Sequence, residues 1–489
     1  MTSSNPHHAR RWAILGILGL AQLMVVLDST IVNIALPSAQ HALHFTNDNR
    51  QWIITAYALA FGSLLLLGGK ISDLFGRKWT FIGGLAGFAI ASAVGGAAQS
   101  FGMLAAARTA QGAFGALLAP AALSLLTTTF IDGAERNKAF GVYSAIAGSG
   151  ASIGLLLGGI LTQTLTWRYC MYVNLVFATI AVIGALRLLH NVRPERRERI
   201  DVPGVLTVSG GLFGLVYGFS HAETASWGSP LTIGSLVTGA ALLAVFALLQ
   251  SRGDHPLLPL RVLADRNRGG SFMAILISGA AMFGVFLFLT YYLQQTRGYS
   301  PITTGLAFLP MTGVVMVTAV LSTTRLRDRF GPRNLVVLGM LLGAAGMGLL
   351  TQLSLTSAYA TAILPALIVM GVGLGLVFSS GMFGATLGVR PSDAGVASAT
   401  VTASQQVGGS LGTALLSTIA ASAGASYLTG HLTGSHPTAA LIAHASVHGY
   451  VTAFAFAAAI FLVGAIVSAV LFERGVPQVA VTSEAVMAH

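Results

Sequence analysis

The apolar stretch at residues 12–36, WAILGILGLAQLMVVLDSTIVNIAL, decides the fold of this chain. It is 25 residues long, and about 20 apolar residues are enough to cross a bilayer as a helix. Its only charged residue is Asp28. A charge at the middle of a bilayer costs about 2.5–3.5 kcal/mol on insertion scales, so such a residue usually has a function. The stretch therefore predicts a membrane-spanning helix that carries a functional acid.

The whole chain has the composition of an all-α integral membrane protein. Of its 489 residues, 54% are hydrophobic and only 8% are charged, whereas a soluble domain carries about 25% charged residues. The net charge of +11 would suggest nucleic acid in a soluble protein. Here the basic residues are explained by loops that stay on the cytoplasmic side. We therefore expect the lipid bilayer as a partner and no nucleic acid.

Cofactors, metals and catalytic residues are not indicated. The single cysteine, Cys170, excludes an intramolecular disulfide and a cysteine metal cluster. His444 and His448 have the i, i+4 spacing of a metal site if their segment is helical. Because no acid or cysteine lies near them, we expect a solvated outer loop instead. Nothing resembling a phosphate-binding loop is present, so ATP is not the expected energy source.

Apolar runs of about 20 residues predict fourteen membrane spans. They lie near residues 12–36, 51–69, 80–99, 103–126, 138–163, 170–189, 203–220, 229–250, 270–293, 301–324, 334–352, 359–383, 395–420 and 449–472. With the N-terminus inside, 22 of the 26 lysines and arginines fall on cytoplasmic segments, and three, Arg50, Arg168 and Arg297, fall on outer loops. This asymmetry predicts that both termini are cytoplasmic.

A short motif occurs twice and predicts two related halves. Asp73-Leu-Phe-Gly-Arg-Lys78 follows the second span, and Asp328-Arg-Phe-Gly-Pro-Arg333 follows the tenth. If spans 7 and 8 are an inserted hairpin, each motif follows the second helix of a six-helix half, which is a transporter architecture. The predicted division is 1–200 for the first bundle, 201–252 for the hairpin, 253–475 for the second bundle and 476–489 for a cytoplasmic tail. Two unrelated basic turns would explain the positive charge of these loops, but not the order of residues that the two motifs share.

The remaining base, Arg108, is predicted to lie in the fourth span at nearly the depth of Asp28. Asp28 is about 12 Å and Arg108 about 8 Å from the outer ends of their helices, at ~1.5 Å per residue. We expect the two groups to meet across a cavity, where Asp28 binds the coupling proton or a cation and Arg108 modulates it. A static ion pair that only fixes packing is the alternative. Four further polar residues are also candidates for the cavity. Each has two interpretations, contact with the substrate or a hydrogen bond between helices. They are Gln22, Asn33, Tyr57 and Gln111.

Two further groups of residues suggest conformational control and tight packing. Gly150, Gly154 and Gly158, followed by Gly159, repeat at four-residue spacing and predict close helix contact or a seal against proton leak. The repeated loops predict a latch whose contacts form in one conformation and break in the other. The proposed latch residues are Gly69, Asp73, Gly76, Arg77, Lys78, Asp328, Arg329 and Arg333. Glycine is expected at Gly69 and Gly76 because the chain turns tightly there. Solvated basic turns that only set topology are the alternative.

Several motifs together resemble the fourteen-span drug:proton antiporter branch of the major facilitator superfamily. They are Leu27–Pro37 in the first span, Gly69–Lys78 after the second, Arg108-Thr-Ala-Gln111-Gly112 in the fourth, Gly154–Gly159 in the fifth, Trp167-Arg168 with Asn174, and Ser404-Gln405-Gln406-Val407-Gly408-Gly409. The resemblance covers about Leu27 to Phe472. Two departures concern coupling: Leu74 stands where the family usually has Arg, and Leu155 follows Gly154 where the family usually has Pro.

The resemblance and the buried charges together predict a proton-coupled exporter in the bacterial cytoplasmic membrane. Its cargo would be lipophilic compounds such as drugs, dyes, biocides or antibiotics, neutral or singly positive, because the second half offers no acid within a span. We expect a monomer that works by alternating access. The main alternative is an uptake facilitator or symporter of the same fold, which the Leu155 departure favours. A membrane enzyme would need converging acids, histidines or metal ligands, and the sequence offers none.

Overall fold

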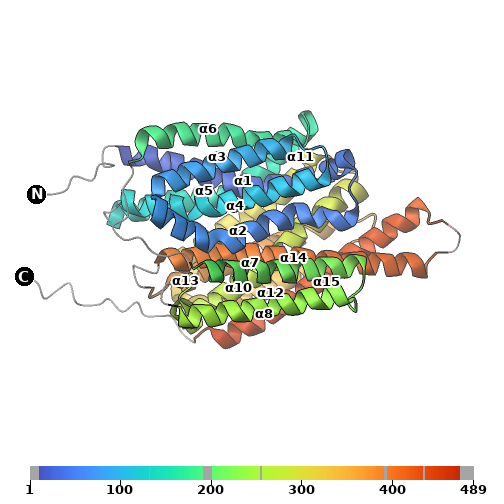
Figure 1. Ribbon diagram of the computed structural model, residues 1–489. Helices are drawn as coiled ribbons and strands as arrows, with labels where there is room; N and C mark the ends of the chain where they lie inside the picture. The colour runs from blue at the N-terminus through green and yellow to red at the C-terminus, as the bar shows by residue number, and fades with distance from the viewer. Residues whose placement is uncertain are drawn as a thin grey trace, which may run out of the picture.

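The protein is described by a computed structural model that covers residues 10–130, 133–190, 201–253, 256–389, 394–432 and 436–473. Within these ranges every regular element is a helix. Helices suit a chain surrounded by lipid because they satisfy their own backbone hydrogen bonds. The helices lie side by side in an elongated bundle, and α1 begins where α15 ends, at the same end of the molecule (Figure 1).

The helices follow one another in two sets of six long helices with a pair between them. The first half contains α1 (Arg11–Leu43), α2 (Asn47–Phe75), α3 (Arg77–Gly96), α4 (Phe101–Thr129), α5 (Gly133–Thr164) and α6 (Tyr169–Leu188). The hairpin contains α7 (Val202–Thr224) and α8 (Pro230–Arg252). The second half contains the short α9 (Leu260–Ala264), then α10 (Arg266–Tyr291), α11 (Pro301–Leu321), α12 (Arg327–Leu350), α13 (Leu364–Thr386), α14 (Ala394–Gly430) and α15 (Ala439–Leu471). Three π-helical turns, η2 (Tyr292–Thr296), η3 (Ser322–Leu326) and η4 (Tyr359–Ile363), adjoin these helices.

Twelve helical stretches in the described residues are long and apolar enough to cross a membrane. One of them, Pro301–Leu350, is 50 residues long and contains both α11 and α12. Gly331 interrupts this stretch with a φ of 73°, outside the helical region. The helix α5 is not among the twelve. The chain is therefore a multi-pass membrane protein.

The two halves pack against each other in a symmetrical way. In each half the second helix contacts the fifth helix of the other half, so α2 packs on α14 and α11 packs on α5. At the end of the bundle where α1 finishes, here called the Leu43 end, residues of the two halves are in close contact. Gln294 Nε2 donates to the Ile34 carbonyl at 3.0 Å, and a Cβ added at Gly159 would lie 2.6 Å from the Pro301 carbonyl oxygen. The halves thus meet tightly at the Leu43 end.

Rows of glycine hold the first and fifth helices of each half together. A Cβ added at Gly154 of α5 would lie 2.0 Å from Thr30 Oγ1 on α1, and Gly150 and Gly158 face the same helix. In the second half, a Cβ at Gly412 of α14 would lie 2.4 Å from Ala280 Cα on α10. Small residues allow helix backbones to approach this closely. The predicted glycine row therefore lies in a helix contact, and Gly159 contributes to the contact between halves.

The repeated loops have the same backbone geometry. Gly76, between α2 and α3, has φ 90°, and its counterpart Gly331 has φ 73°. Residues with a side chain rarely adopt these angles. The prediction of a turn at Gly69 is wrong, because α2 continues through that residue to Phe75. The run Leu64–Gly68 before it is mostly apolar and keeps the backbone helical, so the chain turns only at Gly76.

The hairpin covers the seam between the two halves. Leu212 and Val216 of α7 pack against Leu59 of α2 and Ala414 of α14. Near the end of α7, Gln51 Nε2 of the first half donates to Ser220 Oγ at 3.0 Å. Thr418 Oγ1 of the second half donates to the neighbouring Phe219 carbonyl at 2.7 Å. One end of α7 is therefore bonded to both halves.

The last two long helices extend further than predicted. The spans expected at 395–420 and 449–472 belong to α14, which continues to Gly430, and to α15, which begins at Ala439. At ~1.5 Å per residue, the 37 residues of α14 measure about 55 Å, and their far ends project beyond the other helices (Figure 1). The expected loop was wrong at both His444 and His448, which lie in α15. The His448 ring is 4.9 Å from the Tyr427 ring of α14.

Candidate functional site

The acid and the base that the sequence placed inside spans form an ion pair. Arg108 Nη1 on α4 lies 2.6 Å from Asp28 Oδ2 on α1, and the two side chains are 1% and 0% exposed. The sequence predicted that they would meet across a cavity. Instead, packed helices enclose them, because polar side chains from neighbouring helices occupy the space around the carboxylate. Because water is excluded from such a buried pair, neighbouring side chains and backbone groups must supply its remaining hydrogen bonds.

The other carboxylate oxygen is held by two amides. Gln111 Nε2 donates to Asp28 Oδ1 at 3.0 Å, and Asn174 Nδ2 of α6 donates to the same atom at 2.7 Å. Ser92 Oγ of α3 accepts from Gln111 Nε2 at 2.7 Å and donates to the Phe88 carbonyl at 2.7 Å. Asp28 therefore accepts three hydrogen bonds in the interior of the first half, from α4 and α6.

Arg108 is fixed from two further directions. Its Nε donates to the Ile53 carbonyl of α2 at 3.1 Å, and its guanidinium carbon lies 4.3 Å from the centre of the Tyr57 ring. Its Nη1 also donates to Gln111 Oε1 at 2.9 Å. A ring face attracts a cation, so Tyr57 stabilises the charge of Arg108. The pair consequently links α1, α2 and α4.

The three donors around Asp28 match the hydrogen-bonding capacity of a carboxylate group, which only accepts. All three of its neighbours donate, and a protonated carboxyl group must itself donate its O–H to an acceptor. Asn174 Oδ1 is a buried oxygen that has no hydrogen-bond partner among the described residues. Rotation of this amide would present Oδ1 to a protonated Asp28. The site can therefore serve either protonation state with a small rearrangement.

The other predicted cavity residues fall into two groups. Gln111 and Tyr57 touch the ion pair, as described above. Asn33 instead donates to the Ser29 carbonyl of its own helix at 3.1 Å, and its Oδ1 is buried without a hydrogen-bond partner. Gln22 accepts from Tyr143 of α5 at 2.7 Å. Asn33 and Gln22 lie five and six residues along α1 from Asp28, about 1.4 and 1.7 turns, so their side chains face different neighbours.

The bases of the repeated loops bind the last helix of their own half. Lys78 Nζ donates to the Leu189 carbonyl at the end of α6 at 2.7 Å. Arg333 Nη2 donates to the Ala469 carbonyl near the end of α15 at 2.7 Å. Cations stabilise the carbonyl end of a helix, so both bases act as caps in this conformation.

The remaining residues of the predicted latch make few contacts between helices. The Asp328 side chain is 81% exposed and lies 3.9 Å from the adjacent Arg327, and Arg329 lies over the neighbouring Phe330 ring. Arg77 is half-buried, and the side chain of Asp73 lies outside the described residues. Among the latch residues whose side chains the structure describes, Lys78 and Arg333 are the ones with a hydrogen bond to another helix.

Two residues of the network were not predicted as site residues. Asn174 was noted only as a feature of the resemblance, and Ser92 was not singled out. Both are small polar residues in the middle of apolar helices, and both are fully buried. Such residues often bond within or between helices, so their presence alone did not point to Asp28. The available signal was their position near the predicted depth of Arg108.

Comparison with known proteins agrees with the fold. Residues 18–413 match the model of the Major Facilitator Superfamily. The chain is 48% identical over 466 residues to the puromycin resistance protein pur8 of Streptomyces alboniger, covering 95% of this chain and 92% of that protein. It is 36% identical to the tetracenomycin C resistance and export protein of Streptomyces glaucescens, covering 86% and 78%.

A solved structure shares the fold at low sequence identity. The POT family transporter PepTSo superposes with a TM-score of 0.67 and 14% identity, covering 94% of this chain and 97% of that one. This likeness concerns the fold alone. Together with the match to the family model and the two relatives, it identifies a multi-pass transporter of the bacterial inner membrane rather than an enzyme. The chain belongs to the Major Facilitator Superfamily.

Proposed function

We propose that this transporter exports lipophilic compounds in exchange for protons, and that Asp28 carries the proton. The observation that carries the proposal is the enclosed Asp28–Arg108 pair, with its carboxylate held by three donors. Buried ion pairs add little stability compared with apolar packing, so this pair is better explained by function. Relatives named for resistance and export of antibiotics support the outward direction.

The proposed topology has fourteen crossings with both termini in the cytoplasm. Fourteen helices in the described residues have 20 or more residues, and the lysines and arginines are concentrated on one set of loops. We also propose the division into bundles at 1–200 and 253–475, the hairpin at 201–252 and the tail at 476–489. The tail lies outside the described residues. In this topology the Leu43 end faces outward, so the described state is closed toward the outside.

Proton binding would loosen the link between α1 and α4. A neutral Asp28 loses its charge attraction to Arg108, while Arg108 Nε stays bonded to the Ile53 carbonyl of α2. The helix α1 can then move relative to α2 and α4, and with it α5, which packs on α1 through Gly150, Gly154 and Gly158. Because α5 also contacts α11 of the other half, this movement would reach the contact between halves. The repeated loops would control the same movement at the opposite end.

The proposed cargo is neutral or carries one positive charge, and the transporter acts as a monomer. The second half has no acid within its predicted spans, so a second positive charge on the cargo would have no counter-charge there. Asp28 is enclosed within the first half, so it couples to the cargo through helix movement rather than by direct contact. This separation suits cargo that differs widely in shape.

An efflux assay with a paired control tests the proposal. Inverted membrane vesicles that contain the wild type should take up a fluorescent lipophilic cation when respiration acidifies their interior. Asp28→Asn should abolish this uptake. Glu473→Gln removes one acid from an exposed position and should leave it unchanged. Normal uptake by Asp28→Asn would refute proton coupling at this residue, and proton-driven movement in the opposite direction would indicate a symporter.

A further inference from the structure

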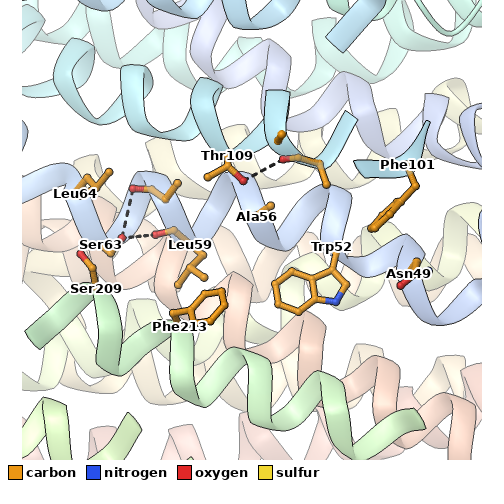
Figure 2. Close-up of a pocket in the computed structure, with 13 residues that line it drawn as sticks. Asn49, Trp52, Ala56, Leu59, Ser63, Leu64, Phe101, Thr109, Ser209 and Phe213 are labelled. Carbon is orange, nitrogen blue, oxygen red and sulfur yellow. Dashed lines mark hydrogen bonds between the residues drawn. The ribbon is translucent and has the colours of Figure 1, made fainter. Parts of the chain in front are cut away.

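A groove lies between the hairpin and the first half, on the far side of α2 and α4 from the ion pair. Its volume is about 520 Å³, which is within the range of about 300–1,000 Å³ for small-molecule sites. Buried residues of α2 form the floor, and residues of α4 and α7 form the two walls (Figure 2). The residues used below are Asn49, Trp52 and Ser63 of α2, Phe101 and Thr109 of α4, and Ser209 and Phe213 of α7.

The groove opens sideways along membrane-spanning helices. Its floor runs from Asn49 to Leu64, about 22 Å at ~1.5 Å per residue, whereas the hydrocarbon layer is about 30 Å thick. At the rim, Thr109 on α4 and Phe213 on α7 are exposed, and Phe213 is 52% exposed. A compound dissolved in the bilayer would therefore meet this opening without passing through water.

The lining combines rings with hydroxyl groups and carries no charge. Trp52, Phe101 and Phe213 come from three different helices, and none of the described residues that line the groove is charged. Figure 2 shows Trp52 and Phe213 projecting into the space between α2 and α7. Such walls suit flat aromatic groups, which stack on rings. A charged ligand would find no partner here.

The hydroxyl group of Ser209 indicates that a ligand in the groove carries a hydrogen-bond acceptor. Ser209 Oγ is buried and has no hydrogen-bond partner among the described residues, and it lies beside Ser63 at the end of the groove away from Asn49 (Figure 2). A buried hydroxyl without a hydrogen-bond partner is unfavourable. The saturated tails of lipids offer no acceptor at this depth, so a ring-containing amphiphile fits better than a lipid tail.

The groove is also adjacent to the residues that hold Arg108. Trp52 precedes Ile53, whose carbonyl accepts from Arg108 Nε. Thr109 follows Arg108 itself in α4. A ligand between α4 and α7 thus contacts the outer surface of the two helices that fix the ion pair.

From these observations we propose that the groove binds an uncharged, ring-containing amphiphile taken from the membrane, and that compounds of this class are among those the protein exports. The inference rests on the proposed export function for the identity of the ligand as cargo. Binding in the groove, however, depends only on the lining residues. The hairpin then supplies one wall of a binding site, which a twelve-helix arrangement of the same halves would lack.

Fluorescence of Trp52 tests binding directly. The protein contains five tryptophans, so replacing Trp12, Trp79, Trp167 and Trp227 with Phe leaves Trp52 as the only indole. This protein, in phosphatidylcholine nanodiscs, is titrated with Nile red, an uncharged aromatic dye. We expect saturable quenching of Trp52 at a dye concentration about tenfold lower than for a protein that retains only Trp79, a difference of about 1.4 kcal/mol. Trp79 is 52% exposed on α3 and serves as the reference for a tryptophan outside the groove.

Substitutions on the hairpin provide the matched controls. Ser209→Phe should fill the groove and remove the saturable quenching, and Ser209→Ala should weaken it. Val237→Phe adds a similar ring at a position of α8 that is 62% exposed, and it should change nothing. Equal titrations of Trp52 and Trp79 would overturn the inference. Quenching by lipids with brominated tails that Nile red cannot relieve would also overturn it, because a lipid would then occupy the groove.

The two proposals can fail separately. Asp28→Asn should abolish proton-driven uptake while leaving the Trp52 titration unchanged. Loss of dye binding in Ser209→Phe with undiminished export of the same dye would show that the groove is not on the export route. Normal export by Asp28→Asn would refute the proposed coupling and leave the groove as a binding site.

Discussion

The two halves of this transporter share their framework but differ in their interior. Each half turns at a glycine with positive φ, caps its last helix with a base two residues later, and packs its fifth helix on its first through glycine. Among the residues that the structure describes, only those of the first half enclose an ion pair. In the second half the buried polar side chains are hydroxyls, including Ser410, Thr413 and Ser417 on α14, together with the amide of Gln406. The shared features build the fold, and the unshared ion pair distinguishes the half to which we assign proton coupling.

The largest effect on stability is expected from a substitution in the Asp28–Arg108 ion pair. Arg108→Ala leaves Asp28 enclosed without its counter-charge, and removal of one partner of a buried pair costs about 3–5 kcal/mol. The free energy of unfolding of the purified protein, measured in detergent with denaturant, should fall by this amount. The double variant Asp28→Asn, Arg108→Ala should recover part of it. A loss below about 1 kcal/mol for Arg108→Ala would indicate that water reaches the pair.

Close packing of α5 on α1 should be the next most sensitive feature. A Cβ at Gly154 would lie 2.0 Å from Thr30 Oγ1, so Gly154→Ala must push α1 and α5 apart. We expect a loss of about 3 kcal/mol, at the upper end of the range for overpacking, together with slower transport. Gly83→Ala on α3 meets no atom within 4 Å, and it should be neutral or slightly stabilising. Equal thermal stability of the two variants would contradict the close contact.

The turn glycines test whether the halves are equivalent. Gly76 and Gly331 both have backbone angles that other residues rarely adopt, and such strain costs about 1–3 kcal/mol. Gly76→Ala and Gly331→Ala should therefore lower the unfolding temperature by similar amounts. A loss confined to one of them would show that the resemblance between the two loops is not structural.

The smallest effects should come from the capping bases. Lys78→Ala removes a donor from the end of α6, and Arg333→Ala removes one from the end of α15. Each should reduce the free energy of unfolding by about 0.3–1 kcal/mol, the usual range for a cation at a helix C-terminus. If either variant instead stops transport while its stability is unchanged, the loops act as a latch rather than only as caps.

The sequence predicted features that depend on composition and spacing. An acid and a base inside apolar runs are expensive, so Asp28 and Arg108 were recognisable without a structure, and Gln111 follows Arg108 by one helical turn. The motif at Gly76 and Gly331 indicated the repeat before any backbone angle was known. Each of these signals depends only on residue type and spacing within one helix or loop, so it can be read without knowing the tertiary contacts.

Features that depend on tertiary contacts were not predictable. Asn174 meets Asp28 because α6 packs against α1, and Ser92 meets Gln111 because α3 packs against α4. A serine or an asparagine in a span has several ordinary uses. The groove beside Trp52 exists because α7 lies over the seam between halves, which no residue pattern indicated. The extensions of α14 and α15 were missed because their ends are polar enough to resemble a loop.

The most direct test of the account is whether Asp28 couples cargo movement to a proton gradient. Purified protein in liposomes is given a labelled lipophilic cation and an imposed pH gradient, and accumulation of the cation is compared with its exchange at equal pH on both sides. We predict that the wild type accumulates the cation against its gradient. Asp28→Asn should fail to accumulate it but still exchange it. Accumulation by Asp28→Asn at the wild-type level would contradict the account.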